Sequence, residues 1–341
     1  MSTLVHHERP HAAPSLTPQP AAPVQLHPHQ QQSIDQALSH LDSGARVTVV
    51  LPCGTGKTLV GQRITEHHAG NLGQVLVVLP TLALLEQTVR AWLANTQVPL
   101  AACVFCSDST IGSVSGIPAF TDAVDVADWL RQPTDRMQVV FTTYQSSPRI
   151  AHGHHERLFP RWSVIVADEA HRCAGGADAA FTTVVDDSRI PAHRRIFLTA
   201  TPRISSHTPT RGAEPMLSMD DTAVFGPTVS VLGFRAAIDL HLLSDYQVCA
   251  VAVTSGQVRE LITHNPAIAI DPDGQPVPAS MVATQIALAT CARQHVLQRI
   301  MVFHNSINTA RHFTTTLGDT LNALGDTSRP AGELAAVHVD S

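Results

Sequence analysis

The segment that most restricts the possible folds is VTVVLPCGTGKT, residues 47–58. An apolar run leads into a loop with two glycines, and Lys57 and Thr58 follow at the start of an expected helix over residues 57–68. A phosphate-binding loop needs glycines so that backbone amides can converge on an anion, then a lysine and a hydroxyl opening a helix. Leu51 stands where the strict pattern G-x-x-x-x-G-K-[ST] has its first glycine. The strand before and the helix after nevertheless favour a nucleotide-binding loop over a chance glycine-rich turn, with ligands expected at Cys53, Gly54, Thr55, Gly56, Lys57 and Thr58.

Short apolar runs alternate with longer helical patterns from residue 30 onward. The expected strands are 47–51, 75–79, 103–107, 138–143, 163–167 and 195–199, and the expected helices include 57–68 and 82–95. Several of these strands are apolar at nearly every position, which is typical of parallel strands buried on both faces. The alternation predicts an α/β fold with right-handed crossovers and a ligand site at the carboxyl ends of the strands.

A second chemical element is VIVADEAH, residues 164–171, an apolar strand that ends in two adjacent carboxylates. Asp168 at the strand end can hold Mg²⁺ through water, and Glu169 can polarise an attacking water molecule. Such a pair by itself is more often a solvated loop or a helix start. In one chain with a phosphate-binding loop it indicates hydrolysis of a nucleotide.

The segments PCGTGKT, DEAH and LTATPR (198–203), in this order, resemble motifs I, II and III of superfamily 2 DEAD/DEAH-box helicases and translocases. The segment LHPHQ, ending at Gln30, is similar to the one whose glutamine recognises adenine. The resemblance covers residues 26–305. VLPTLALLEQ (78–87) is similar to motif Ia, FTTYQS (141–146) to a segment that touches the nucleic-acid backbone, and MVFHNSI (301–307) to motif IV. MDDTAVFG (219–226) followed by AIDLHLLSDYQV (237–248) resembles the linker of bacterial members that carry a helicase-associated domain.

This resemblance implies that the cofactors are ATP and Mg²⁺. Lys57 would bind the β and γ phosphates, and Thr58 would ligate Mg²⁺ together with Asp168. His171, Thr199 and Thr201 would couple the nucleotide state to the nucleic-acid groove, although hydroxyls in the turn after a strand explain the two threonines in isolation. Weaker expectations are nucleic-acid contacts at Thr81, Thr143 and Tyr144, of which buried packing explains the last nearly as well.

The chain is expected to divide into a Pro/His-rich tail (1–25), a RecA-like P-loop NTPase domain (26–203), a linker (204–243) and a partial second RecA-like domain (244–341). In the last part, strands are expected within 244–253 and at 300–304 and 334–339, and helices at 279–298 and 306–317. Neither motif V nor the arginine-bearing motif VI is visible after Asn305. Because an arginine finger speeds phosphoryl transfer by orders of magnitude, a C-terminally truncated chain with impaired turnover is expected.

The functional hypothesis is an ATP-dependent helicase or translocase, acting on DNA rather than RNA. The alternatives are a nucleotide- and nucleic-acid-binding module with little turnover, completed by another chain, or the motor part of a restriction or repair complex. The formal net charge of −6 restricts nucleic-acid contacts to local groups. Six scattered cysteines and the lack of a signal or spanning segment favour the cytoplasm and no membrane contact. Three groups of residues could in principle bind a metal ion, but simpler explanations are favoured. Cys103 and Cys106 are expected to be buried cysteines on a strand. His6 with His7 and His11, and His152 with His154 and His155, are expected to be solvated loop histidines.

Overall fold

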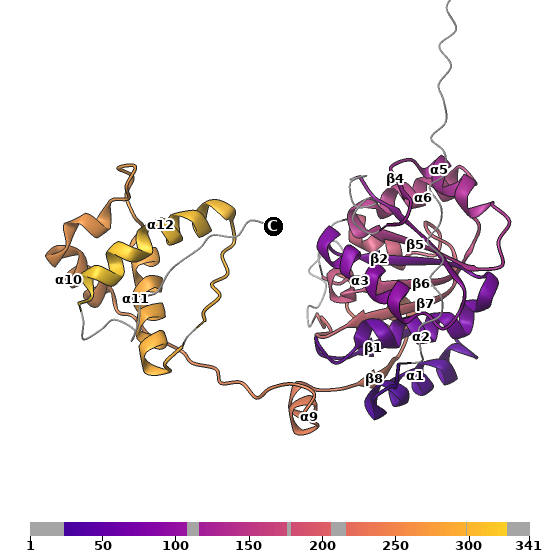
Figure 1. Cartoon of the computed structure of the whole chain (residues 1–341), viewed down its shortest axis with the longest axis horizontal. Coiled ribbons are helices and arrows are strands. Elements are labelled where there is room, and N and C mark those ends of the chain that lie inside the picture. Colours follow the sequence, from indigo (N-terminus) through magenta and orange to yellow (C-terminus); the bar gives the residue numbers. More distant parts are fainter. Residues whose placement is uncertain (1–23, 108–115, 176–178, 206–215, 298, 326–341) are drawn as a thin grey trace, which may run out of the picture. The chain divides into compact units, whose positions relative to one another are not determined.

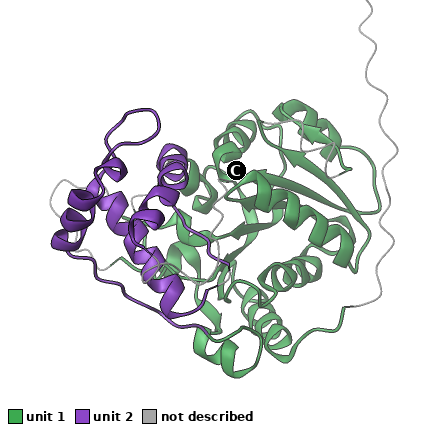
Figure 2. Ribbon diagram, turned by 60° about the vertical axis from the view of Figure 1, so that its left-hand side comes forward, with its two compact units in different colours: residues 1–245 green, residues 246–341 purple. Residues whose placement is uncertain are grey.

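The computed structural model describes residues 24–107, 116–175, 179–205, 216–297 and 299–325. The chain forms two compact units, residues 1–245 and 246–341 (Figure 2). The predicted domain boundaries at residues 25, 203 and 243 stay predictions. The tail histidines His6, His7 and His11 lie outside the described residues, as does the expected strand at 334–339.

The first unit is built on a parallel sheet of eight strands in the order β4-β3-β5-β2-β6-β7-β1-β8 (Figure 1). All six predicted strands are present, and the α/β RecA-like fold is confirmed. The strands are β1 (Arg46–Val50), β2 (Gln74–Leu79), β3 (Leu100–Phe105), β4 (Ala119–Phe120), β5 (Met137–Thr143), β6 (Trp162–Asp168), β7 (Ala192–Thr199) and β8 (Thr228–Val231). The sequence patterns did not predict β4 and β8, because these edge strands are short and partly exposed and so lack a continuous apolar run.

Helices cover both faces of this sheet. Side chains of β2 alternate between two separate cores: Val75 and Val77 pack with α1 to α3, whereas Leu76 and Val78 pack with α5 and α6. Burial on both faces is the reason for the unbroken apolar runs of the central strands. The helices are α1 (Pro28–Leu41), α2 (Lys57–Ala69), α3 (Leu82–Asn95), α5 (Ala123–Leu130), α6 (Ser147–His155), α7 (Ala179–Thr182), α8 (Thr222–Phe225) and α9 (Phe234–Asp239), with 3-10 turns η1 (Gly70–Leu72), η2 (Tyr144–Ser146), η3 (Ala170–Cys173) and η4 (Thr183–Val185).

This packing on the two faces of the sheet shows whether two of the possible metal-binding groups, the cysteine pair and the group with His154, could hold a metal ion. Cys103 and Cys106 are buried in the two different cores, on opposite faces of the sheet, so they cannot share a metal ion. His154 accepts a hydrogen bond from Nε1 of the buried Trp162 at 2.9 Å, and burial lowers the pKa of this imidazole to about 4. The predicted buried cysteines are therefore confirmed, while His154 is a partly buried histidine that packs on Trp162 rather than a solvated one.

The regular elements among the described residues of the second unit are all helices. It contains α10 (Ser255–His264), η5 (Pro266–Ala269), α11 (Ala279–Gln294) and α12 (Ile307–Ala323), which enclose a small apolar core around Val282, Ala289 and Phe313. The strands expected within 244–253 and at 300–304 are wrong: both segments are extended but belong to no sheet. Val248 and Phe303 are 87% and 84% exposed there. An apolar run becomes a strand only where a neighbour supplies ladder hydrogen bonds and covers a face.

Among the described helices, we find none that combines the length and the apolar character needed to cross a bilayer.

Candidate nucleotide site

The loop between β1 and α2 has the backbone shape that an anion-binding turn requires. Gly54 and Gly56 have φ angles of 85° and 88°, in the left-handed region that glycine enters without strain. A Cβ atom on Gly56 would lie 2.0 Å from Nε2 of Gln30. The hydroxyl of Thr55 donates to the carbonyl of Pro52 at 2.8 Å and holds the turn from within. The loop therefore leads directly into the amino-terminal turn of α2, where backbone amides are unpaired.

Lys57 meets the two predicted carboxylates at the carboxyl edge of the sheet. Its Nζ lies 2.6 Å from Oε1 of Glu169 and 3.6 Å from Oδ1 of Asp168. The loop follows β1 and the carboxylates follow β6, and these strands are separated in the sheet only by β7. Lys57 is also the single lysine in the 341-residue sequence. The structure thus brings together a phosphate-type loop, one ammonium group and two carboxylates.

Burial sets the electrostatics of this cluster. The side chains of Lys57, Asp168 and Glu169 are only 7%, 11% and 19% exposed. Burial raises the pKa of Asp168, the ammonium of Lys57 opposes this rise, and the neighbouring Glu169 adds to it. A cation beside Asp168 would keep its carboxyl group ionised, so this environment fits a bound divalent metal ion. Thr58, the other predicted metal ligand, is half-buried in the first turn of α2.

A chain of short contacts runs from the carboxylates to the end of β7. Nδ1 of His171 lies 3.3 Å from Oε2 of Glu169 and 3.1 Å from the hydroxyl of Thr199. The backbone N–H of Thr201 donates to that same hydroxyl at 3.2 Å. Burial lowers the pKa of His171, with Glu169 opposing the shift. The three residues predicted to couple the nucleotide site to a nucleic-acid groove therefore form one continuous network.

Gln30 lies against the loop, with both ends of its amide engaged by the protein. Its Nε2 donates to the carbonyl of Thr55 at 3.1 Å, and its Oε1 accepts from the backbone N–H of His27 at 2.9 Å. The neighbouring His29 was not predicted, yet its Nε2 lies 2.9 Å from the same Thr55 carbonyl. The motif LHPHQ places this histidine next to Gln30, which is the one signal that could have indicated it.

The three residues predicted to touch nucleic acid differ in exposure. Thr81 is exposed and caps α3, accepting a hydrogen bond from the N–H of Leu84 at 3.3 Å. Thr143 is 5% exposed, and Tyr144 is fully buried, with its hydroxyl donating to the carbonyl of Asp168 at 2.8 Å. Packing encloses the ring of Tyr144, which fits the alternative of buried packing, and its contact with nucleic acid stays a prediction. Its hydrogen bond helps to position the end of β6.

Comparisons with known proteins agree with this geometry. A family model described as "Type III restriction enzyme, res subunit" matches residues 23–204. The structure of the "ATP-dependent Type ISP restriction-modification enzyme LlaBIII bound to DNA" is similar over 88% of this chain and 22% of that chain, with 25% identity and a TM-score of 0.70. A nuclease-deletion mutant of the Type ISP enzyme LlaGI, in complex with a DNA substrate mimic, is similar over 65% and 18%, with 32% identity and a TM-score of 0.57.

This chain spans about a fifth of the length of these two relatives. No curated protein matches it. The family match covers more than half of the sequence, including the phosphate-type loop, both carboxylates and the end of β7. The chain therefore belongs to the Type III restriction enzyme res subunit family, within the superfamily 2 helicases.

Proposed function

We propose that this chain is the nucleotide-binding part of an ATP-dependent translocase that acts on DNA in the cytoplasm. The observation that carries the proposal is the meeting of Lys57 with Asp168 and Glu169 beside a loop with two left-handed glycines. Phosphoryl transfer depends mainly on positioning and charge stabilisation, and this cluster offers groups for both.

Each residue has a role that its position supports. The ammonium of Lys57, now paired with Glu169 at 2.6 Å, would turn to the β and γ phosphates of ATP. Thr58 and Asp168 would hold Mg²⁺, which neutralises charge on the phosphates when it is bound. Glu169, freed from Lys57, would orient a water molecule and accept its proton.

Coupling to DNA would run through the network that leaves the site. His171 contacts both Glu169 and Thr199, so a shift of the carboxylate on nucleotide binding changes the contacts of the β7 end. Thr81, the N-cap of α3, is the exposed one of the three residues expected to contact nucleic acid and could bind a backbone phosphate. The choice of DNA over RNA, and a role as a restriction motor, rest on the two similar structures, both of which contain DNA or a DNA mimic.

A second candidate function is a nucleotide- and DNA-binding module with little turnover, completed by another chain. It is favoured by the described residues of the second unit, 246–297 and 299–325, which form helices and contain no strand. The family resemblance implies that a second RecA-like domain supplies arginines to the transition state. A helical unit offers no sheet edge on which to carry them.

The single lysine allows a direct test of the site. An amine-reactive ATP acyl phosphate should label Lys57 and otherwise only the terminal amine, and excess MgATP should protect Lys57 alone. Lys57→Ala should weaken MgATP binding about 10- to 100-fold, as expected for the loss of a charged hydrogen bond. Binding that is indifferent to Lys57 would refute both candidate functions.

Hydrolysis distinguishes the two candidates. The translocase predicts turnover that duplex DNA stimulates more than RNA does and that Glu169→Gln abolishes. Glu86→Gln is the matched control, because this carboxylate pairs with Arg90 on the surface of α3. MgATP binding without stimulated turnover would favour the binding module instead.

A further inference from the structure

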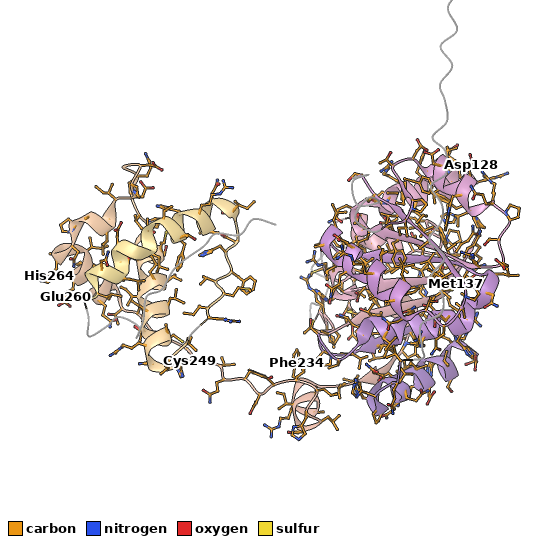
Figure 3. All side chains as sticks on the ribbon, viewed as in Figure 1. Asp128, Met137, Phe234, Cys249, Glu260 and His264 are labelled. Atoms are coloured by element: carbon orange, nitrogen blue, oxygen red, sulfur yellow. The ribbon has the colours of Figure 1, made fainter. Side chains whose placement is uncertain are left out.

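The second unit contains a cluster of metal-ligating side chains that the nucleotide site does not use. The ligand atoms of Cys249, Cys291 and His295 all lie within 4.8 Å of one another. Sγ of Cys249 lies 3.2 Å from Nε2 of His295. Cys249, labelled in Figure 3, lies on the segment before α10. The other two residues lie at the end of α11. The contact joins two residues that are 46 positions apart in the sequence.

The end of α11 places its two ligands on one side of the helix. Cys291 lies in the last turn, and His295, four residues later, is the C-cap. The N–H of His295 donates to the carbonyl of Cys291 at 3.0 Å, which keeps the helical spacing through the cap. Side chains four residues apart in a helix lie above one another. Val296 then turns the chain away with a φ of 49°, a strained value for a β-branched residue.

We propose that Cys249, Cys291 and His295 bind a zinc ion. Two thiolates and an imidazole are a ligand set that Zn²⁺ prefers, and three protein ligands leave a fourth tetrahedral position for water. With Zn–S and Zn–N bonds of about 2.3 and 2.1 Å, tetrahedral ligand atoms lie about 3.6–3.8 Å apart. Cys249 and His295 lie 3.2 Å apart and every pair of ligand atoms lies within 4.8 Å, so small side-chain rotations would bring the three atoms to these separations.

The chemistry of the ligands gives a second test of the site. Zinc binds cysteine as the thiolate, so zinc binding should release protons, whereas a simple hydrogen bond between Cys249 and His295 should not.

The ion would act as a clip in a unit with a small core. The segment around Cys249 belongs to no strand, and its neighbour Val248 is 87% exposed. A bond through zinc would tie this segment to the end of α11 and would stabilise the folded unit by mass action. This role is separate from nucleotide binding, which depends on residues of the first unit.

The test uses the untagged 341-residue chain, purified under reducing conditions and titrated with Co²⁺ and then Zn²⁺. We expect about one tightly bound ion, with an intense thiolate-to-cobalt absorption band that zinc abolishes. Cys249→Ser and Cys291→Ser should each lose this band, and His295→Gln should weaken cobalt binding at least about tenfold. His264→Gln is the matched control, because this exposed histidine contacts only the Glu260 carbonyl of its own helix, and it should leave the band intact.

The thiolate band separates this site from ions held by histidines elsewhere in the chain. Zinc should also raise the melting temperature of the parent chain but not of Cys291→Ser. The proposal is overturned by a chain that binds cobalt without a thiolate band, or by a band that persists in both serine variants. A Cys249–Cys291 disulfide that survives in the reduced protein, detected by mass spectrometry, would overturn it too.

Discussion

Replacing Lys57 by methionine should destabilise the first unit in a manner that depends on pH. The ammonium lies 2.6 Å from Glu169 and 3.6 Å from Asp168, and all three side chains are at least four-fifths buried. Breaking a fully buried pair costs about 3–5 kcal/mol, because the partner charge is left uncompensated. Solvent still reaches Glu169, which is 19% exposed, so we expect a loss of about 2–3 kcal/mol in the free energy of unfolding at pH 8.

The pH dependence follows from the carboxyl groups. Burial already raises the pKa of Asp168, and Lys57 is the main group that opposes this rise. Without the ammonium, the folded-state pKa of Asp168 should rise further above its unfolded value. A raised acid pKa contributes stability that is present below the unfolded pKa and is lost as pH rises through the folded pKa. The loss caused by Lys57→Met should therefore be smaller at pH 5 than at pH 8.

Urea unfolding followed by tryptophan fluorescence measures this loss. The sequence has three tryptophans, Trp92, Trp129 and Trp162, and all of them lie in the first unit, so the signal reports on that unit alone. Glu169→Gln should cost less than Lys57→Met, and the double variant should be more stable than Lys57→Met because one uncompensated carboxylate is gone. A loss below about 0.5 kcal/mol, or an equal loss at both pH values, would refute the reasoning.

Three further predictions concern the contact of Thr199 with His171, the pKa of His154 and the turn at Gly226. Thr199→Val removes the hydroxyl that lies 3.1 Å from Nδ1 of His171. The ratio of DNA-stimulated to unstimulated ATP hydrolysis should therefore fall at least about fivefold. An unchanged ratio would contradict the proposed coupling. Burial lowers the pKa of His154 to about 4. The stability contributed by its neutral imidazole should therefore be lost as pH falls from about 6.5 to about 4. His154→Gln should flatten the plot of unfolding free energy against pH over this range. In Gly226→Ala the new Cβ would lie 2.2 Å from the carbonyl oxygen of Arg46, at a residue whose φ is 67°. Urea unfolding should therefore show a loss of about 2–4 kcal/mol in the free energy of unfolding. A loss below about 1 kcal/mol would mean that the turn relaxes.

Much of the nucleotide site follows from the sequence because its determinants are local. Gly54, Gly56 and Lys57 lie within four residues, and the apolar run before them can form only a buried strand. The two carboxylates follow a second strand of the same kind. In a parallel sheet all strands end at one edge, so the sequence predicts that the loop and the carboxylates meet.

Contacts between distant residues were decided only by the tertiary structure. The pairing of Lys57 with Glu169 joins residues 112 apart, and the contact of Cys249 with His295 joins residues 46 apart. The ring of Tyr144 stacks on Phe181 in the tertiary structure, and the Gln30 amide joins its own segment to the phosphate-type loop through Thr55.

The second unit shows the same division. Its apolar runs at 244–253 and 300–304 were expected to be strands, yet they form neither strand nor helix, because no strand among the described residues pairs with them. The sequence by itself predicted a helix over 279–298, and α11 (Ala279–Gln294), which carries Cys291 and is capped by His295, confirms it. Only the folded chain could bring Cys249 beside them, since hydrogen bonds and side-chain contacts between segments depend on position in space rather than on sequence pattern.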